Sequence, residues 1–148
     1  MSARGKARLA ALELLFEGEA RGMDPLAMVA DREAAAVTGP AAGAQPSVRP
    51  YTKELLAGVA AQQQRIDELL STYSTGWALD RMPAVDRAAL RLGAWELLFN
   101  EEVPDAVVID EAASLAAKYS TDNSPKFVSG LLNRLKDLKP ALNAPTIN

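Results

Sequence analysis

Residues 83–100, PAVDRAALRLGAWELLFN, are the stretch that decides the fold. At about 100° per residue, one apolar face of a helix here comprises Val85, Ala88, Ala89, Leu92, Trp95 and Phe99. A second face, nearly opposite, comprises Leu90, Ala94 and Leu97. A helix that is apolar on two sides either lies at the centre of a fold or offers one side to a partner. The sequence leaves both possibilities open.

The same helical period runs through the rest of the chain and predicts an all-α protein. Further helices are expected before residue 23 and over 25–37, 51–73, 103–120 and from 124 onward, with a short helical turn within 74–82. Gly58 lies inside the third of these helices, where close packing against another helix would explain it. No segment alternates with period two for long enough to predict a strand.

The chain is expected to form one domain over residues 1–148. Residues 38–50, TGPAAGAQPSVRP, contain three Pro and two Gly and are predicted to be a flexible linker. The linker lies within an N-terminal helical subdomain, 1–73, which precedes a C-terminal helical subdomain, 78–140.

Composition excludes most catalytic chemistry. The 148 residues include no Cys and no His, which removes disulfides, Cys and His nucleophiles, His bases and most transition-metal sites. We therefore expect no catalytic residue, no metal and no cofactor. Glu96 falls among the apolar residues of 83–100, and we expect a cation from another helix to pair with it rather than a catalytic role. No apolar run approaches the roughly 18 to 20 residues that span a bilayer, and a cytoplasmic setting is expected.

The positive charges are segregated to the two ends of the chain. Arg4, Lys6 and Arg8 give the N-terminal end a charge of +3, although cations are unfavourable at the positive end of a helix. The C-terminal end also carries +3, since its four cations outnumber its one acid by three; these residues are Lys126, Arg134, Lys136 and Lys139, with Asp137. The net charge of the whole chain is −3, so the residues between the two ends carry −9. Either the N-terminal cations belong to a solvated arm, or they bind an anion such as phosphate. If the first and last helices lie side by side, the two ends form one patch.

Residues 121–136, TDNSPKFVSGLLNRLK, begin the last helix. Ser124 can cap this helix, and Pro125 suits its first position. A capping box would place Glu or Gln where Phe127 stands, next to Lys126. Phe127 is either a core contact or a platform for an unstacked RNA base, with Lys126 for phosphate and Asn123 for base edges.

The order and spacing of VDRAALRLGAWEL, VPDAVVIDEA and DNSPKFVSG resemble those of the NusB family of bacterial transcription antitermination factors, its actinobacterial branch most closely. The resemblance covers nearly the whole chain. It implies a NusB-like fold of two perpendicular helical subdomains with about six to seven helices. It also implies a protein that is not an enzyme and that binds single-stranded boxA RNA of ribosomal RNA leader transcripts. The protein would do so with the ribosomal protein NusE, and would act on the RNA polymerase elongation complex indirectly, to promote processive transcription of ribosomal RNA.

The resemblance also implies roles for particular residues. RNA-binding residues would be Arg4, Lys6, Arg8, Asn123, Lys126 and Phe127. Asp86 and Leu90 would face NusE. Two alternatives remain: a helical protein-interaction module that forms a homodimer, or a stand-alone relative of the RNA-binding domain of ribosomal RNA cytosine methyltransferases. The methyl-transfer reaction itself needs an α/β domain and a nucleophilic Cys, and this chain has neither.

Overall fold

The computed structural model describes residues 2–38 and 48–142, and within them every regular element is helical. The elements are α1 (Ala3–Arg21), α2 (Pro25–Thr38), α3 (Pro50–Tyr73), the short 3₁₀ helix η1 (Leu79–Arg81), α4 (Ala84–Phe99), α5 (Asp105–Tyr119) and α6 (Ser124–Leu142). The predicted all-α class, the number of helices and the short turn within 74–82 are confirmed. Most of the predicted linker, residues 39–47, lies outside the described residues.

Local sequence signals set the helix ends. Proline stands at the first position of α2 and α3 and directly before α4 and α5, where a missing N–H costs nothing. Gly22 ends α1 with φ of 65°, in the left-handed region that glycine enters without strain, and its N–H reaches back to the carbonyls of Gly18 and Glu19. At the other end of α1, the hydroxyl of Ser2 accepts from the N–H of Gly5. Because these signals are local, the observed helix boundaries lie close to those expected from the sequence.

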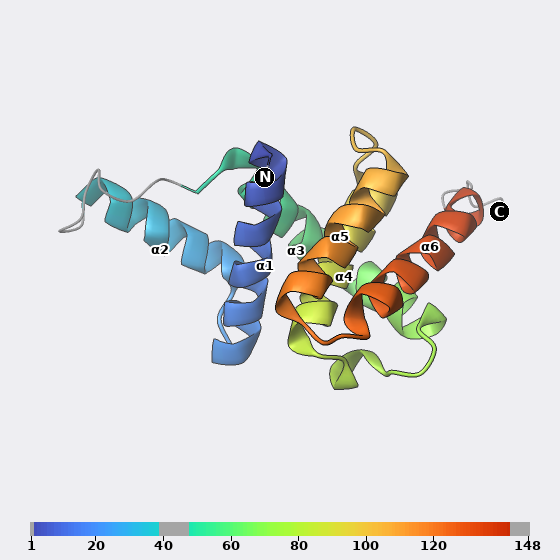
Figure 1. The fold of residues 1–148 in the computed structure, drawn as a ribbon. Helices are drawn as coiled ribbons and strands as arrows, with labels where there is room; N and C mark the ends of the chain where they lie inside the picture. Colours follow the sequence, from blue (N-terminus) through green and yellow to red (C-terminus); the bar gives the residue numbers. More distant parts are fainter. Residues whose placement is uncertain (1, 39–47, 143–148) are drawn as a thin grey trace.

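Helix α4 lies at the centre of the fold. It packs against α1, α3, α5 and α6 (Figure 1), so both of its apolar faces are covered within the chain. Leu90 and Ala94 are fully buried and Leu97 nearly so, which means that the second face belongs to the core and is not a partner surface. Phe99, at the last turn of α4, is 40 % exposed, so this end of the first apolar face is not fully covered.

Close helix packing depends on glycine at two positions. A Cβ atom on Gly58 of α3 would overlap the indole ring of Trp95, and a Cβ on Gly93 of α4 would approach Leu132 of α6 to 2.7 Å. The expectation that Gly58 permits close packing is therefore confirmed. The core is continuous from α1 and α3 through α4 to α5 and α6, and the division into two perpendicular subdomains stays a prediction.

Within the described part of the chain, no helix is long and apolar enough to cross a bilayer. Helix α5 lies between α1 and α6 (Figure 1), and this arrangement positions the surfaces described next.

Candidate nucleic-acid interface

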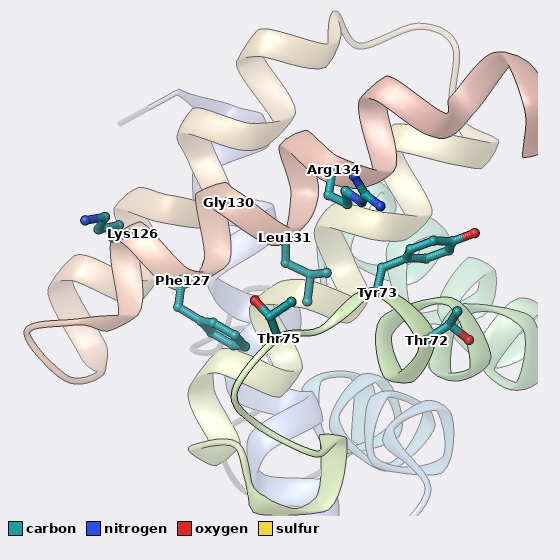
Figure 2. Close-up of a pocket in the computed structure, with 8 residues that line it drawn as sticks. All are labelled: Thr72, Tyr73, Thr75, Lys126, Phe127, Gly130, Leu131 and Arg134. Atoms are coloured by element: carbon teal, nitrogen blue, oxygen red, sulfur yellow. The ribbon is translucent and has the colours of Figure 1, made fainter.

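The start of α6 is an exposed turn that carries one acid, Asp122, before the helix and one cation, Lys126, within its first turn. Asn123 and Lys126 are exposed, and the first turn of α6 contains no acidic residue to offset the positive end of the helix dipole. Within the described residues no carboxylate lies within 4.0 Å of the Lys126 ammonium group. In Figure 2 the Lys126 side chain points away from Phe127. An anion would therefore meet both the helix end and a free cation here.

Ser124 does not cap α6 as expected. Its side chain is fully buried, and its hydroxyl accepts from the N–H of Thr121 at 3.2 Å and donates to the Ser120 hydroxyl at 3.1 Å. The carbonyl of Asn123 instead accepts from the N–H of Phe127 at 3.1 Å. The serine hydroxyl thus holds the turn between α5 and α6 together and does not serve the helix end.

Phe127 makes the core contact that was one of its two interpretations, and its role as a platform for an RNA base stays a prediction. Its ring is partly buried against the core and meets Trp77 edge to face, with ring centroids 5.1 Å apart and an interplanar angle of 75°. It also lines a cavity of about 580 Å³ between the end of α3 and α6. Figure 2 shows Phe127 on one side of this cavity and Tyr73 with Arg134 on the other, with Thr75 between them.

The predicted N-terminal cations separate into two kinds. Arg4 is exposed and forms a surface ion pair with Glu102 at 3.3 Å, and Lys6 is exposed without an ion-pair partner among the described residues. Arg8 is 4 % exposed, and its guanidinium donates to both carboxylate oxygens of Glu96 at 2.7 and 2.8 Å. The expectation that Arg8 contacts RNA directly is therefore wrong, because its guanidinium donates to Glu96 inside the protein.

The Arg8–Glu96 pair belongs to a buried network. The Tyr51 hydroxyl donates to Glu96 at 2.7 Å and accepts from the Asn100 amide at 2.9 Å. Burial, and then the hydrogen bond to Glu96, raise the pKa of Tyr51 above its ordinary value. Burial alone would lower the pKa of Arg8, but its hydrogen bond and attraction to Glu96 outweigh that effect and raise it. The expectation that Glu96 finds a cation on another helix is confirmed.

Lys126 does not form one patch with Arg4 and Lys6. Arg4 meets Glu102, in the turn before α5, whereas Lys126 follows the turn after α5. Arg4 and Lys126 are thus at opposite ends of α5, which lies between α1 and α6 in Figure 1. Lys139, near the end of α6, instead pairs with Asp105 at the start of α5, which is the same end of α5 as Arg4. A 15-residue helix is about 22 Å long. A ligand touching both Arg4 and Lys126 would have to extend over roughly that distance.

Asp86 and Leu90 are both fully buried. The expectation that their side chains face a partner protein is therefore wrong. Asp86, in the first turn of α4, accepts a hydrogen bond from the Ser120 hydroxyl at 2.5 Å. Its second carboxylate oxygen has no partner among the described residues. Because Ser120 is also bonded to Ser124, the carboxylate anchors the turn that carries Asn123 and Lys126.

A shallow apolar groove lies next to Asp86 on the surface. It has a volume of about 280 Å³ and is lined by Leu9, Leu12, Glu13, Phe16, Val85 and Tyr119. Phe16 and Tyr119 are 44 % and 41 % exposed, which is unusual for large aromatic side chains grouped together. Such a groove suits an apolar side chain from another protein.

Sequence reasoning missed several of these residues. It gives Tyr73 and Trp77 no role in a site, and it includes Arg134 only as one of the charges at the C-terminal end. The available signal was the pair of aromatics flanking residues 74–76, but no local rule says that this loop faces α6. Within the described residues no three His, Cys, Asp or Glu side chains group as metal ligands.

Comparison with known proteins gives one consistent result. Residues 5–137 match the NusB family. The transcription antitermination protein NusB of Streptomyces avermitilis is 54 % identical over 144 residues, which cover 96 % of each chain. The solved structure of T. maritima NusB is similar with a TM-score of 0.76, 33 % identity and 92 % coverage of each chain. A structure of the antitermination factors NusB and NusE in complex with dsRNA gives a TM-score of 0.73 at 26 % identity, covering 90 % of this chain and 96 % of that one.

Proposed function

The chain belongs to the NusB family of transcription antitermination proteins and is not an enzyme, and from this premise we propose that it binds single-stranded boxA RNA of ribosomal RNA leaders jointly with NusE. The complex would keep an elongating RNA polymerase processive, with the polymerase reached through the other components. The related NusB structure that contains NusE and RNA supports both kinds of partner.

One observation carries the RNA-binding proposal: the first turn of α6 has no acid, and its exposed Lys126, which has no ion-pair partner among the described residues, precedes Phe127, whose ring lines a cavity. A capping carboxylate at Phe127 would repel phosphate here. The helix end and Lys126 attract phosphate instead, and the ring offers a stacking surface. Asn123, exposed in the same turn, is suited to base edges.

Arg4 and Lys6 would supply a second set of phosphate contacts at the far end of α5. Both side chains of the Arg4–Glu102 ion pair are exposed to solvent. Replacing the carboxylate partner of Arg4 by a phosphate therefore costs little free energy. Arg8 has no direct contact in this proposal. It holds the start of α1 in place through Glu96.

NusE would dock on the apolar groove between α1, α4 and α5. Phe16 and Tyr119 offer the exposed aromatic surface that protein interfaces use at their centre. Asp86 and Leu90 are buried and would not touch the partner; Asp86 directly follows Val85, which lines the groove. A second copy of the chain could compete for the same groove.

The test is fluorescence anisotropy of labelled boxA RNA, with a scrambled RNA as control, with and without NusE at several salt concentrations. For single strands the log–log salt slope is about −0.7 per phosphate neutralised, so three to five contacts predict roughly −2 to −3.5. The double variant Lys6→Ala/Lys126→Ala should make the slope shallower by about 1.4. Arg65→Ala, at an exposed position of α3 without an ion-pair partner among the described residues, serves as the control and should leave the slope unchanged.

Selective binding of boxA that tightens with NusE is the expected result. Equal binding of boxA and scrambled RNA in both conditions would contradict the proposed function. It would favour the alternative of a protein-interaction or dimerisation module instead.

A further inference from the structure

The cavity beside α6 has the chemistry of a nucleotide site. Its walls come from the end of α3, the loop that follows it, and α6. They include Thr72, Tyr73, Thr75, Phe127, Gly130 and Arg134. The volume of about 580 Å³ falls within the range of small-ligand sites, about 300 to 1,000 Å³. No acidic side chain lines it.

Two aromatic rings and one cation face this space. Phe127 is braced edge to face by Trp77, and the Arg134 guanidinium lies 5.8 Å from the ring centroid of Tyr73. Within the described part of the chain Arg134 has no carboxylate partner within 4.0 Å. Its charge is therefore available to an anion, while the rings offer flat apolar surfaces.

Gly130 gives independent support. Glycine inside a helix costs about 1 kcal/mol of stability relative to alanine. At Gly58 and Gly93 this cost is offset by close packing against Trp95 and Leu132. A Cβ atom on Gly130 would meet nothing within 4 Å, so no packing contact requires glycine there. Gly130 lies one turn from both Phe127 and Arg134 and lines the cavity (Figure 2). A side chain at this position would project towards the space that a ligand would fill.

We propose that the cavity holds one unstacked nucleotide of the bound RNA, with its base between Phe127 and Tyr73 and its phosphate at Arg134. This rests on the proposed RNA-binding function and extends it. The RNA site then includes the end of α3 and two more turns of α6, and Gly130 is a specificity-determining residue that leaves room for the base.

The first test occludes the cavity without disturbing the fold. Gly130→Leu should bind boxA RNA about 5- to 150-fold more weakly, the range expected for loss of one base stack. Its melting temperature should be unchanged or higher, since leucine favours the helix. Gly130→Ala adds only one methyl group and should bind nearly as the parent does.

The second test identifies the nucleotide by coupling. Each boxA nucleotide in turn is replaced by an abasic residue, and binding is measured with the parent protein and with Gly130→Leu. At one position the abasic change should weaken the parent but add no further loss in Gly130→Leu. Arg134→Gln should make the salt slope shallower by about 0.7. Arg65→Gln, which is also exposed and has no ion-pair partner in the described part of the chain, should not change the slope.

The outcomes separate the two levels of the proposal. If the parent binds boxA selectively but Gly130→Leu binds equally well, or no abasic position shows coupling, the cavity holds no base and only this inference fails. If the parent shows no selective binding, the proposed function and the inference both fail. Loss of NusE binding alone in Gly130→Leu would make the cavity a protein contact and would also overturn the inference.

Discussion

Arg8 and Glu96, which are 88 positions apart in the sequence, form a buried two-point ion pair at 2.7 and 2.8 Å. The pair fastens the first helix to the central one. It also takes one of the three N-terminal cations out of the surface that an anion could reach. Arg8 therefore contributes to the fold, and its neighbours Arg4 and Lys6 remain exposed on the surface.

Arg8→Met should lower the free energy of unfolding by about 3 to 5 kcal/mol, because it leaves the Glu96 carboxylate buried without its cation. Replacing both partners, as in Arg8→Met/Glu96→Leu, should recover most of that loss, measured by urea denaturation. The double variant, once folded, should bind RNA as the parent does. A double variant that is stable but binds RNA much more weakly would return Arg8 to the RNA interface.

Tyr51 should make stability fall at high pH. Its pKa is higher in the folded protein than the value of about 10 in an unfolded chain, so above pH 10 the unfolded state releases a proton that the folded state keeps. The contribution is complete below about pH 10 and is lost above it, with a slope of at most about 1.4 kcal/mol per pH unit. Tyr51→Phe should lose about 1 kcal/mol at neutral pH and show a smaller slope above pH 10. Equal slopes for both proteins in denaturation between pH 9 and 11.5 would contradict this.

Gly58→Ala should destabilise the protein by about 1 to 3 kcal/mol although alanine is the better helix former. The added methyl group would overlap the buried ring of Trp95. Gly130→Ala is the matched comparison, because its methyl group meets open space, and it should gain about 0.5 to 1 kcal/mol. Thermal denaturation of the two variants should give shifts of opposite sign, and shifts of the same sign would show that propensity outweighs packing.

Phe16→Ala should weaken NusE binding by about 2 kcal/mol or more if the apolar groove is the docking site. Its ring is 44 % exposed, so the folded protein should lose little stability. Val37→Ala changes an apolar residue that is 76 % exposed on α2, away from the groove, and serves as the control. Isothermal titration with NusE should separate the two variants. A change in self-association without any change in NusE affinity would assign the groove to a second copy.

Asp86→Ala should loosen the turn between α5 and α6. It removes the acceptor of the Ser120 hydroxyl, with an expected loss of about 1 to 3 kcal/mol. Asp86→Asn keeps an acceptor and should lose less. Hydrogen exchange of the amides in residues 121–127 should be faster in Asp86→Ala than in the parent. Unchanged exchange there would mean that the carboxylate does not anchor the turn.

The helices could be predicted from the sequence because their signals are local. The apolar period and the prolines at Pro25, Pro50 and Pro104 fix where each helix runs and begins. The two-sided pattern of α4 left a choice between core and partner surface. That choice depends on whether α5 and α6 cover the second face, which no pattern within α4 can state.

The candidate site was only partly predictable, since its contacts join distant segments. Lys126 and Phe127 broke a local rule at a helix start, so the sequence could single them out. Arg8 looked like Arg4 in the sequence, and only Glu96 on another helix distinguishes them. Tyr73 joins the cavity because α3 ends opposite α6, a relation that the spacing of residues does not encode.

The turn between α5 and α6 connects the two proposed binding surfaces. Val85 and Tyr119 line the apolar groove, and their chain neighbours Asp86 and Ser120 are hydrogen-bonded to each other. Ser120 is bonded in turn to Ser124, one residue before the proline that leads to Lys126 and Phe127.

A protein seated in the groove would then rest on the same polar chain that holds the RNA-facing turn in place. Thermodynamic reciprocity follows from such a shared support. If the protein partner raises the affinity for RNA by some factor, the RNA raises the affinity for that partner by the same factor. Each ligand would thereby act as a reporter of the other, and only a transcript that carries its boxA sequence would assemble the full complex at low concentrations of both proteins.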